Sequence, residues 1–377
     1  MPDWVGDAVA EITERAEREL EALVAVSSPS GDRRAAEEAI AVATALLPSG
    51  VEVERVACSS PDHAPDLLAT LTGTGSRRLL LLGHVDTVIA HEHHRPIQRA
   101  DDRLVGSGVI DMKGGVVLAL GVLRALAHVP EAYAEVALLL VCDEEWRTAA
   151  WAHGERFTGY DACLCFEAGQ RTDAGGEGVV VRRKAAGTLR VRAQGVAAHS
   201  GSSPDRGRNA LLALTRVAQT MAAHHAPAGP ERLTVVPTIL RSGEALNVVP
   251  ATGELFCDLR AERLEAFDAV LASVPEDMAG VTLEADMIRR WPGMDARSVT
   301  APLLQRAGRR LGRRIVAAER GGASDASHVA QAVPLTIDGL GPHGGGAHTP
   351  GEYLLVESLR PRVEVALAVA AEAVAGS

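Results

Sequence analysis

Three short apolar runs, each followed by a histidine or an acid, are the sequence feature that most restricts which fold this chain can adopt. They cover residues 79–82, 136–141 and 163–166, and helical periodicity over residues 114–126 separates the first two. Uninterrupted apolar runs of this length are typical of strands buried on both faces of a sheet, with helices as cover. The order strand, helix, strand predicts an α/β fold, with a mostly parallel sheet and helices on both faces.

The pattern changes twice along the chain, which predicts a divided domain with an insert. Helical periodicity at residues 5–23 and 32–47 precedes the apolar runs. Between residues 188 and 285, alternating strands are interleaved with two amphipathic helices, as in a small α+β domain. After residue 301 the α/β character returns. We therefore expect a catalytic domain in two parts, residues 1–183 and 295–377, with an α+β domain inserted at residues 184–294.

Composition and charge disfavour several classes of partner. The formal charge of −11 argues against nucleic acid and anionic membrane surfaces, and no apolar run is long enough to span a bilayer. The N-terminus lacks an apolar signal core and the five cysteines lack metal-finger spacing, so we expect a cytoplasmic protein with reduced thiols. One basic stretch, from Arg306 to Arg320, has the spacing of the outer face of a helix, either solvated or binding an anion.

Polar side chains follow the first apolar run where the strand is expected to end. His84 and Asp86 are two residues apart, so on a strand they would point the same way. A neutral imidazole is a good zinc ligand, and a carboxylate behind it fixes the tautomer. Taken alone, the pair would also fit a surface loop. Ligands of open α/β sheets bind at the carboxyl ends of the strands, which favours a metal site.

Other acids and a second histidine occur at comparable points. The second run ends in three acids at residues 143–145 and the third in Glu167, while Asp111 and His348 lie in glycine-rich segments. A solvated acidic loop is the alternative for residues 143–145. Two histidines and three carboxylates are too many for one tetrahedral zinc, but they suit two metals about 3.5–4 Å apart. The histidines within residues 91–94 are instead expected to form a flexible loop.

The sequence resembles the M20 metallopeptidase family over nearly its whole length. This family includes glutamate carboxypeptidases, desuccinylases and aminoacylases. Five motifs carry the resemblance: His84-Val85-Asp86-Thr87-Val88, the segment 108–115, Asp143-Glu144-Glu145, Phe166-Glu167 and His348-Thr349-Pro350. The resemblance implies a zinc-exopeptidase-like catalytic domain, and it makes the insert a ferredoxin-like lid and dimerisation domain.

The resemblance implies a role for each candidate metal ligand. His84 and Glu167 match the ligands of one metal, and Glu145 and His348 match those of the other. Asp111 matches the bridging carboxylate. The implied cofactors are two Zn²⁺ ions per chain, and carboxylate-rich ligation would also accept Co²⁺ or Mn²⁺.

Two catalytic residues follow from the same resemblance. Asp86 matches the partner of His84, and Glu144 matches the general base that acts on a water between the two metals. The sequence departs from the family just after these acids, where Gly and Ser are usual and this chain has Trp146-Arg147. This departure leaves the metal ligands intact and bears on the substrate.

The insert contains three further residues that match the family. His199 matches a histidine that reaches across a dimer to the neighbouring active site, and Asn247 and Arg260 match substrate contacts. From the residues alone, His199 could be a surface histidine near a turn. Arg260 could simply pair with Asp258, which shares its strand face.

These features predict a di-zinc amidohydrolase that cleaves a peptide or N-acyl amide bond next to a carboxylate-bearing amino acid. Its expected partners are a small peptide or N-acyl amino acid substrate and a second copy of the chain, bound through the insert. A biosynthetic N-acyl-amino-acid deacylase is one alternative. A non-catalytic dimeric binding protein on the same fold is another, and its signature would be loss of Glu144 or of a metal ligand.

Overall fold

The computed structural model describes residues 4–172 and 176–376, which form two compact units. The first unit holds the residues up to Arg182, Asp295–Glu319 and the residues from Ser324 onward. The second unit holds Arg183–Met294 and the short segment Arg320–Ala323. Each unit has a hydrophobic core of its own.

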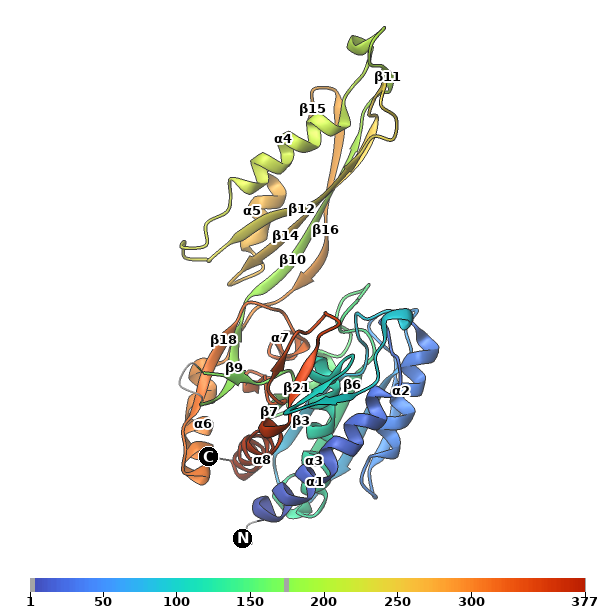
Figure 1. Ribbon diagram of the computed structural model, residues 1–377. Helices are drawn as coiled ribbons and strands as arrows, with labels where there is room; N and C mark the ends of the chain where they lie inside the picture. The colour runs from blue at the N-terminus through green and yellow to red at the C-terminus, as the bar shows by residue number, and fades with distance from the viewer. Residues whose placement is uncertain (1–3, 173–175, 377) are drawn as a thin grey trace. The chain divides into compact units, whose positions relative to one another are not determined.

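A six-stranded sheet forms the centre of the first unit (Figure 1). In order across the sheet, its strands are β1 (Glu52–Val56), β2 (Asp66–Thr72), β6 (Glu135–Val141), β3 (Arg78–His84), β7 (Ala162–Cys165) and β19 (Thr336–Ile337). The last four run parallel to one another, whereas β2 is antiparallel to both of its neighbours. The mostly parallel α/β sheet predicted from the apolar runs is therefore confirmed.

Helices cover this sheet. They are α1 (Trp4–Val24), α2 (Arg33–Ala45), α3 (Gly114–Ala127), α6 (Arg297–Leu311), α7 (Asp325–Val329) and α8 (Leu359–Ala375). Every residue of α3 from Gly114 to Leu126 is buried. Gly115 lets α3 approach the backbone that follows β7 closely, since a Cβ there would lie 1.8 Å from the backbone oxygen of Phe166. In the described part of the chain, no helix has the length and apolarity needed to cross a bilayer.

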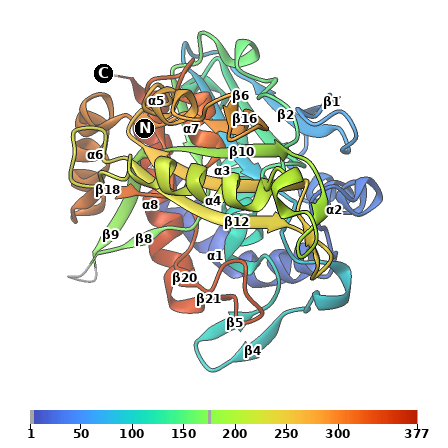
Figure 2. The same ribbon diagram turned by 90° about the horizontal axis from the view of Figure 1, so that it is seen from above.

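Shorter elements complete the first unit. β20 (Gly344–Gly345), β21 (Tyr353–Leu355), β5 (Arg103–Val105) and β4 (Gln98–Ala100) form an antiparallel sheet, seen at the lower edge of Figure 2. β9 (Glu177–Arg183) pairs with β8 (Gln170–Arg171) and lies between β17 (Met294–Asp295) and β18 (Ile315–Arg320). Single helical turns lie at His91–His93, Val109–Lys113, Pro130–Ala132, Glu155–Phe157 and Val356–Ser358.

The basic stretch from Arg306 to Arg320 does not form a single helix, so that expectation is wrong. α6 ends at Leu311 because Gly312 takes the left-handed conformation, with φ 64°, that commonly ends helices. The β-branched residues that begin at Ile315 then start β18. Three arginines of the stretch pair with glutamates of α8, so this surface is bound to a neighbouring helix.

The second unit is an antiparallel sheet with two helices (Figure 2). Its strands, in order across the sheet, are β12 (Thr234–Ser242), β14 (Thr252–Ala261), β10 (Ala185–Gln194), β16 (Val281–Trp291) and β15 (Asp277–Met278). The helices are α4 (Ala210–Ala222) and α5 (Ala266–Ala272), and β11 (Ala198–His199) pairs antiparallel with β13 (Val248–Val249) in a separate two-stranded sheet. A 3₁₀ turn lies at Pro204–Arg206. The order β10, α4, β12, β14, α5, β16 is the ferredoxin-like topology predicted for the insert, which is therefore confirmed.

Candidate metal centre

His84, the last residue of β3, points its imidazole at two carboxylates. It pairs in register with Val141, the last residue of β6, so the parallel strands set its position. Nδ1 lies 3.0 Å from the backbone oxygen of Asp86. Nε2 therefore faces Asp111 Oδ1 at 3.3 Å and Glu167 Oε1 at 3.7 Å. The histidine is only 1% exposed, so packing fixes the direction of the ring.

Asp86 joins the ends of two neighbouring strands. Its Oδ1 accepts a hydrogen bond from the backbone N–H of Glu144 at 3.2 Å, and its Oδ2 accepts one from that of Glu145 at 3.0 Å. These bonds satisfy a carboxylate that is 1% exposed. The predicted partner of His84 thus also fixes the backbone of the acids that follow β6.

A third segment supplies Asp111, and a buried glutamate holds that segment in place. Three backbone N–H groups donate to the carboxylate of Glu352, those of Gly108 (2.8 Å), Ile110 (2.8 Å) and Asp111 (3.0 Å). Gly108 has φ 73°, which glycine adopts readily, and the peptide bond between Asp111 and Met112 is cis. Sequence reasoning missed Glu352, because a lone glutamate before a short strand carries no motif signal.

His348 approaches the same carboxylate from the C-terminal part of the chain. Its Nε2 lies 3.1 Å from Asp111 Oδ2 and 3.2 Å from Glu145 Oε2. The residue has φ 65° in a glycine-rich turn, a backbone conformation that is uncommon outside glycine. Its side chain is 53% exposed, so this side of the centre is open to solvent.

The five residues predicted to bind metal form two groups that share Asp111. One group is His84, Asp111 and Glu167, and the other is Asp111, Glu145 and His348. Within each group, the candidate ligand atoms lie within 4.8 Å of one another. Asp111 presents Oδ1 to the first group and Oδ2 to the second. A carboxylate placed in this way suits a bridged pair of cations.

The charges of this cluster also fit divalent cations. Hydrogen bonds with Asp111 and Glu145 raise the pKa of His348 to about 10. Burial opposes the charged form of His84, but hydrogen bonds with Asp111 and Asp86 raise its pKa well above the usual range. Protonated imidazoles thus offset the negative charge of the carboxylates, and bound cations would take the place of those protons. Imidazole and carboxylate donors without a thiolate suit Zn²⁺, Mn²⁺ or Co²⁺.

Glu144 lies beside the two groups and is not a member of either. It is 9% exposed, and burial raises the pKa of its carboxyl well above the usual range. The negative charge of Glu167 adds to this effect. A carboxyl group in such surroundings takes up a proton more readily than an exposed one, as a general base must.

A buried arginine locks the loop that follows β6. Arg147 lies 2.8 Å from Asp143 and 2.5 Å from Asp325, and its side chain is 2% exposed. Asp143 also accepts bonds from the backbone N–H and the hydroxyl of Ser60, at 2.9 and 2.7 Å. Segments far apart in the sequence therefore fix the backbone next to the candidate base. The sequence showed Arg147 only as a departure from the family pattern, and nothing in its spacing indicated this pairing.

The candidate residues of the second unit bond to their immediate surroundings. Nδ1 of His199 accepts the backbone N–H groups two and three residues later, each at 3.1 Å. The neutral ring therefore carries its proton on Nε2. Arg260 makes two 3.0 Å bonds to Asp258, the pairing that the sequence left open. Asn247 is exposed, and its backbone oxygen accepts a bond of 2.9 Å from the N–H of Ser200.

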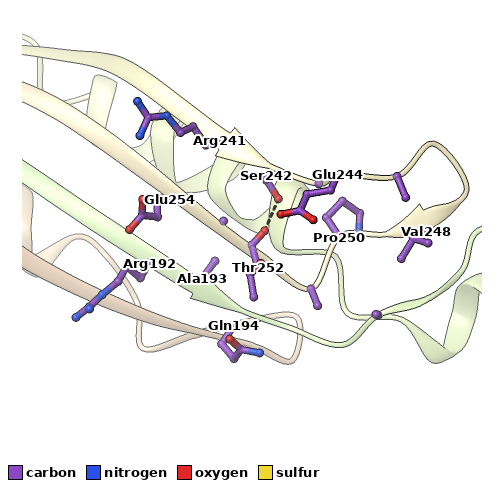
Figure 3. Close-up of a pocket in the computed structure, with 15 residues that line it drawn as sticks. Arg192, Ala193, Gln194, Arg241, Ser242, Glu244, Val248, Pro250, Thr252 and Glu254 are labelled. Atoms are coloured by element: carbon purple, nitrogen blue, oxygen red, sulfur yellow. Dashed lines mark hydrogen bonds between the residues drawn. The ribbon is translucent and has the colours of Figure 1, made fainter.

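The second unit also contains a cavity of about 670 Å³ beside β10, β12 and β14 (Figure 3). Arg192, Arg241, Glu244 and Glu254 are among the residues that line it. None of its lining residues belongs to the two ligand groups found in the described parts of the chain. The cavity therefore has mixed charge without the ligand chemistry seen in the first unit.

The histidines within residues 91–94, expected to form a flexible loop, lie at a 3₁₀ turn. His91 anchors this turn through Ser27 Oγ at 2.8 Å and Asp32 Oδ2 at 3.0 Å. These histidines are outside both ligand groups that the described residues form. The candidate metal ligands are therefore the residues near the strand ends, and the histidines of residues 91–94 are not among them.

Fold and site together define the class, a metal-dependent hydrolase with an α/β catalytic domain and a ferredoxin-like insert. The chain belongs to peptidase family M20/M25/M40, which matches residues 80–372. It is 29% identical to carboxypeptidase G2 of Pseudomonas sp. (strain RS-16) over 371 residues, covering 92% of this chain and 86% of that protein. It is also 29% identical over 331 residues to a succinyl-diaminopimelate desuccinylase of Methylorubrum extorquens, covering 79% of this chain and 84% of that protein.

Solved structures share the fold. The aminopeptidase PepT from Bacillus cereus ATCC 10987 has a TM-score of 0.75 at 22% identity, covering 96% of this chain and 98% of that one. An M20 family metallo-carboxypeptidase from Sulfolobus solfataricus has a TM-score of 0.74 at 15% identity, covering 95% and 99%. With the family established, the chain is a hydrolase of the metallopeptidase and amidohydrolase type.

Proposed function

We propose that this chain is a di-zinc amidohydrolase that cleaves a peptide or N-acyl amide bond next to a carboxylate-bearing amino acid. One observation carries the proposal, namely that two groups of ligand atoms share Asp111. The residues come from strand ends and loops of the first unit, where open α/β sheets bind their ligands.

The two ligand groups would hold one cation each, with Asp111 between them. Cations in these positions would polarise the amide carbonyl and lower the pKa of the attacking water. Asp86 keeps His84 in the tautomer whose Nε2 is free to bind. Glu352 holds the backbone of Asp111 through three hydrogen bonds, so the shared carboxylate is positioned before a cation arrives.

Glu144 is the proposed general base. Asp86 fixes its backbone, and burial gives its carboxyl a raised pKa, so it can take the proton of the attacking water. The same carboxyl can then deliver that proton to the leaving amine. Proton transfer by a positioned side chain contributes about 10²–10⁴-fold to the rate, which sets the expected cost of losing Glu144.

Three residues of the second unit are assigned to the substrate on the family resemblance. His199 offers an Nε2–H donor that suits a developing oxyanion. Arg260 carries a planar fork that matches a carboxylate, and it would exchange its present partner Asp258 for the substrate. Asn247 offers an exposed side-chain amide.

A homodimer through the second unit is part of the proposal. β12 is an edge strand, and its Val236, Ile239 and Leu240 are 44%, 42% and 39% exposed. Apolar edge strands pair readily with another chain. If His199 serves the neighbouring site, inactive His199→Ala and Glu144→Ala chains should regain activity when mixed. No recovery despite proven subunit exchange would argue against a shared site.

A biosynthetic N-acyl-amino-acid deacylase is the second candidate. The observation in its favour is the desuccinylase relative, which matches at the same 29% identity as the carboxypeptidase. A non-catalytic binding protein is disfavoured, since Glu144 and all five candidate ligands are present. Rates on dipeptides and on N-acyl amino acids separate the two hydrolase candidates.

Metal analysis combined with such a hydrolysis screen tests the proposal. We expect about two zinc ions per chain, hydrolysis of at least one amide series, and loss of activity on chelation. Full activity in a chain stripped of metal would overturn the di-zinc proposal.

A further inference from the structure

We propose that the amide cleaved by this chain carries an uncharged apolar acyl group, which binds in a pocket walled by Trp146. The inference rests on the hydrolase function proposed above and names its substrate class. The Trp146 pocket is a cavity of about 390 Å³ in the first unit. Its lining includes Pro29, Ser30, Val88, Ala90, Glu145 and Trp146.

The pocket adjoins the candidate metal centre. Glu145 belongs to its lining, and Oε2 of the same residue lies 3.2 Å from His348 Nε2. Trp146 directly follows Glu145, so the indole is attached one residue from a proposed metal ligand. A group held in this pocket therefore lies next to the place where the scissile amide is expected.

The walls are apolar and face solvent. Trp146 is 70% exposed and Val88 is 44% exposed, although both are large apolar side chains. Pro29 and Ala90 extend the same lining. Exposed apolar side chains gathered at a cavity beside a catalytic centre mark a ligand contact, because covering them with an apolar group releases ordered water.

The pocket is formed before a ligand arrives. Backbone hydrogen bonds join two of its segments, from Thr87 N–H to Ser28 O at 2.9 Å and from Ser30 N–H to Thr87 O at 2.8 Å. Pro29 and Thr87 also form a parallel bridge. A preorganised site of this kind binds without the cost of ordering its loops.

Charge decides which acyl group fits. Glu145 is the one acid in the lining and is a proposed metal ligand, and none of the residues that line the cavity is basic. A carboxylate at the end of the acyl group, such as that of a succinyl group, would lie against apolar walls here without a basic side chain to pair with it.

The size of the pocket fits one ring with a short linker. A cavity of about 150 Å³ is enough to hold benzene. The 390 Å³ of the Trp146 pocket therefore admits a phenylacetyl or a branched aliphatic acyl group. An acetyl group would leave most of the apolar wall uncovered.

Three derivatives of one amino acid test the inference in the zinc-loaded enzyme: N-phenylacetyl, N-acetyl and N-succinyl. We expect kcat/KM to be about 10–200-fold higher for the phenylacetyl substrate than for either of the others, the range that apolar pocket contacts provide. Trp146→Ala should remove about 10-fold or more of that preference. An N-succinyl rate equal to or above the phenylacetyl rate would overturn the inference.

Two valines provide a matched control. Val88 and Val53 are both 44% exposed, but only Val88 lines the pocket, and Val53 lies on β1. Val88→Ala should lower kcat/KM for the phenylacetyl substrate several-fold, whereas Val53→Ala should leave it unchanged. Equal effects of the two substitutions would count against the pocket. Ala90→Lys, which adds a cation, should shift the preference toward the N-succinyl substrate.

A binding measurement separates this inference from the hydrolase proposal. Phenylacetate is titrated by calorimetry into zinc-loaded wild type and Trp146→Ala. Binding that weakens about 10-fold or more in the variant supports the pocket, even if no amide is cleaved, in which case only the hydrolase proposal fails. Equal binding to both proteins, or binding to neither, overturns the pocket even where hydrolysis is observed.

Discussion

The two units present their candidate residues in opposite ways. In the first unit, His84 and Glu145 are held by other side chains and by backbone that is itself fixed by Asp86. In the second, His199 and Asn247 are exposed, and the hydrogen bonds that they make with described residues go to nearby backbone. The difference indicates that the reactive geometry is built into the first unit. Under the proposed function, the residues of the second unit would contribute once a substrate or a partner chain binds.

The two sheets explain this difference. β3 is buried on both faces, so polar residues are displaced to its carboxyl end, where neighbouring strands bring their own polar ends. β12 is an edge strand whose residues are mostly exposed, so its surroundings do not restrict side-chain chemistry. Burial of the strands therefore gathers charged residues at one sheet edge in the first unit, whereas exposed strands let charged residues spread over the second unit.

The largest expected effect is on the chemistry of the first unit. Glu144→Gln should lower kcat by about 10³-fold or more, because the amide cannot accept the proton of water. Zinc content should stay near that of wild type, since Glu144 belongs to neither ligand group. Steady-state kinetics with metal analysis measures both quantities. Wild-type activity in this variant would remove Glu144 from its proposed role.

The next effect is on the stability of the loop that follows β6. Arg147→Met leaves Asp143 and Asp325 buried without their common cation, which should cost about 3–5 kcal/mol of unfolding free energy. Urea denaturation of the metal-free protein measures this loss. Adding Asp143→Asn and Asp325→Asn to the same chain should recover part of it. A loss below about 1 kcal/mol, the value typical of surface pairs, would mean that the pair does not lock the loop.

A smaller effect should appear with pH at Glu177, a partly buried acid of the first unit that contacts two basic side chains. Hydrogen bonds from His343 and Arg362 outweigh burial and lower the pKa of Glu177 from 4.5 to about 2. Because the folded pKa is depressed, this stabilisation is present above pH 4.5 and is lost as pH falls toward 2. The loss should be roughly 2–3 kcal/mol for a shift of this size. Glu177→Gln should show no such loss when its unfolding free energy is compared at pH 6 and pH 3.

The smallest effect on stability should come from the second unit. His199→Ala should change the unfolding free energy by less than about 0.5 kcal/mol, as expected for an exposed side chain. Catalysis should nevertheless fall, because the Nε2–H donor is lost. Urea denaturation and kinetics of the same variant test both statements. A large loss of stability would contradict the contrast between the units.

The positions of the central strands and the identities of the candidate ligands could be predicted from local sequence patterns. The runs at residues 79–82 and 136–141 predicted β3 and β6 because strands buried on both faces need unbroken apolar residues. Five motifs then indicated the ligand residues, and the structure places those residues together. Local sequence pattern was sufficient to predict a site residue wherever the end of one strand and the neighbouring strand define that residue's position.

Long-range pairing could not be predicted in the same way. Glu352 and the partnership of Arg147 with Asp325 depend on segments far apart in the chain, and no spacing encodes them. The end of α6 is different, because Gly312 and the β-branched residues from Ile315 did signal a break that the periodicity of the arginines obscured. Charge spacing was a weaker guide than turn chemistry there.

A crystal structure of the zinc-loaded protein, with anomalous data recorded at the zinc edge, would test the proposed pair of cation sites most directly. We predict two peaks about 3.5–4 Å apart, with one oxygen of Asp111 at each and with His84 and His348 on opposite sides. A single peak, or peaks held by other residues, would contradict the claim that this sheet edge binds a pair of cations.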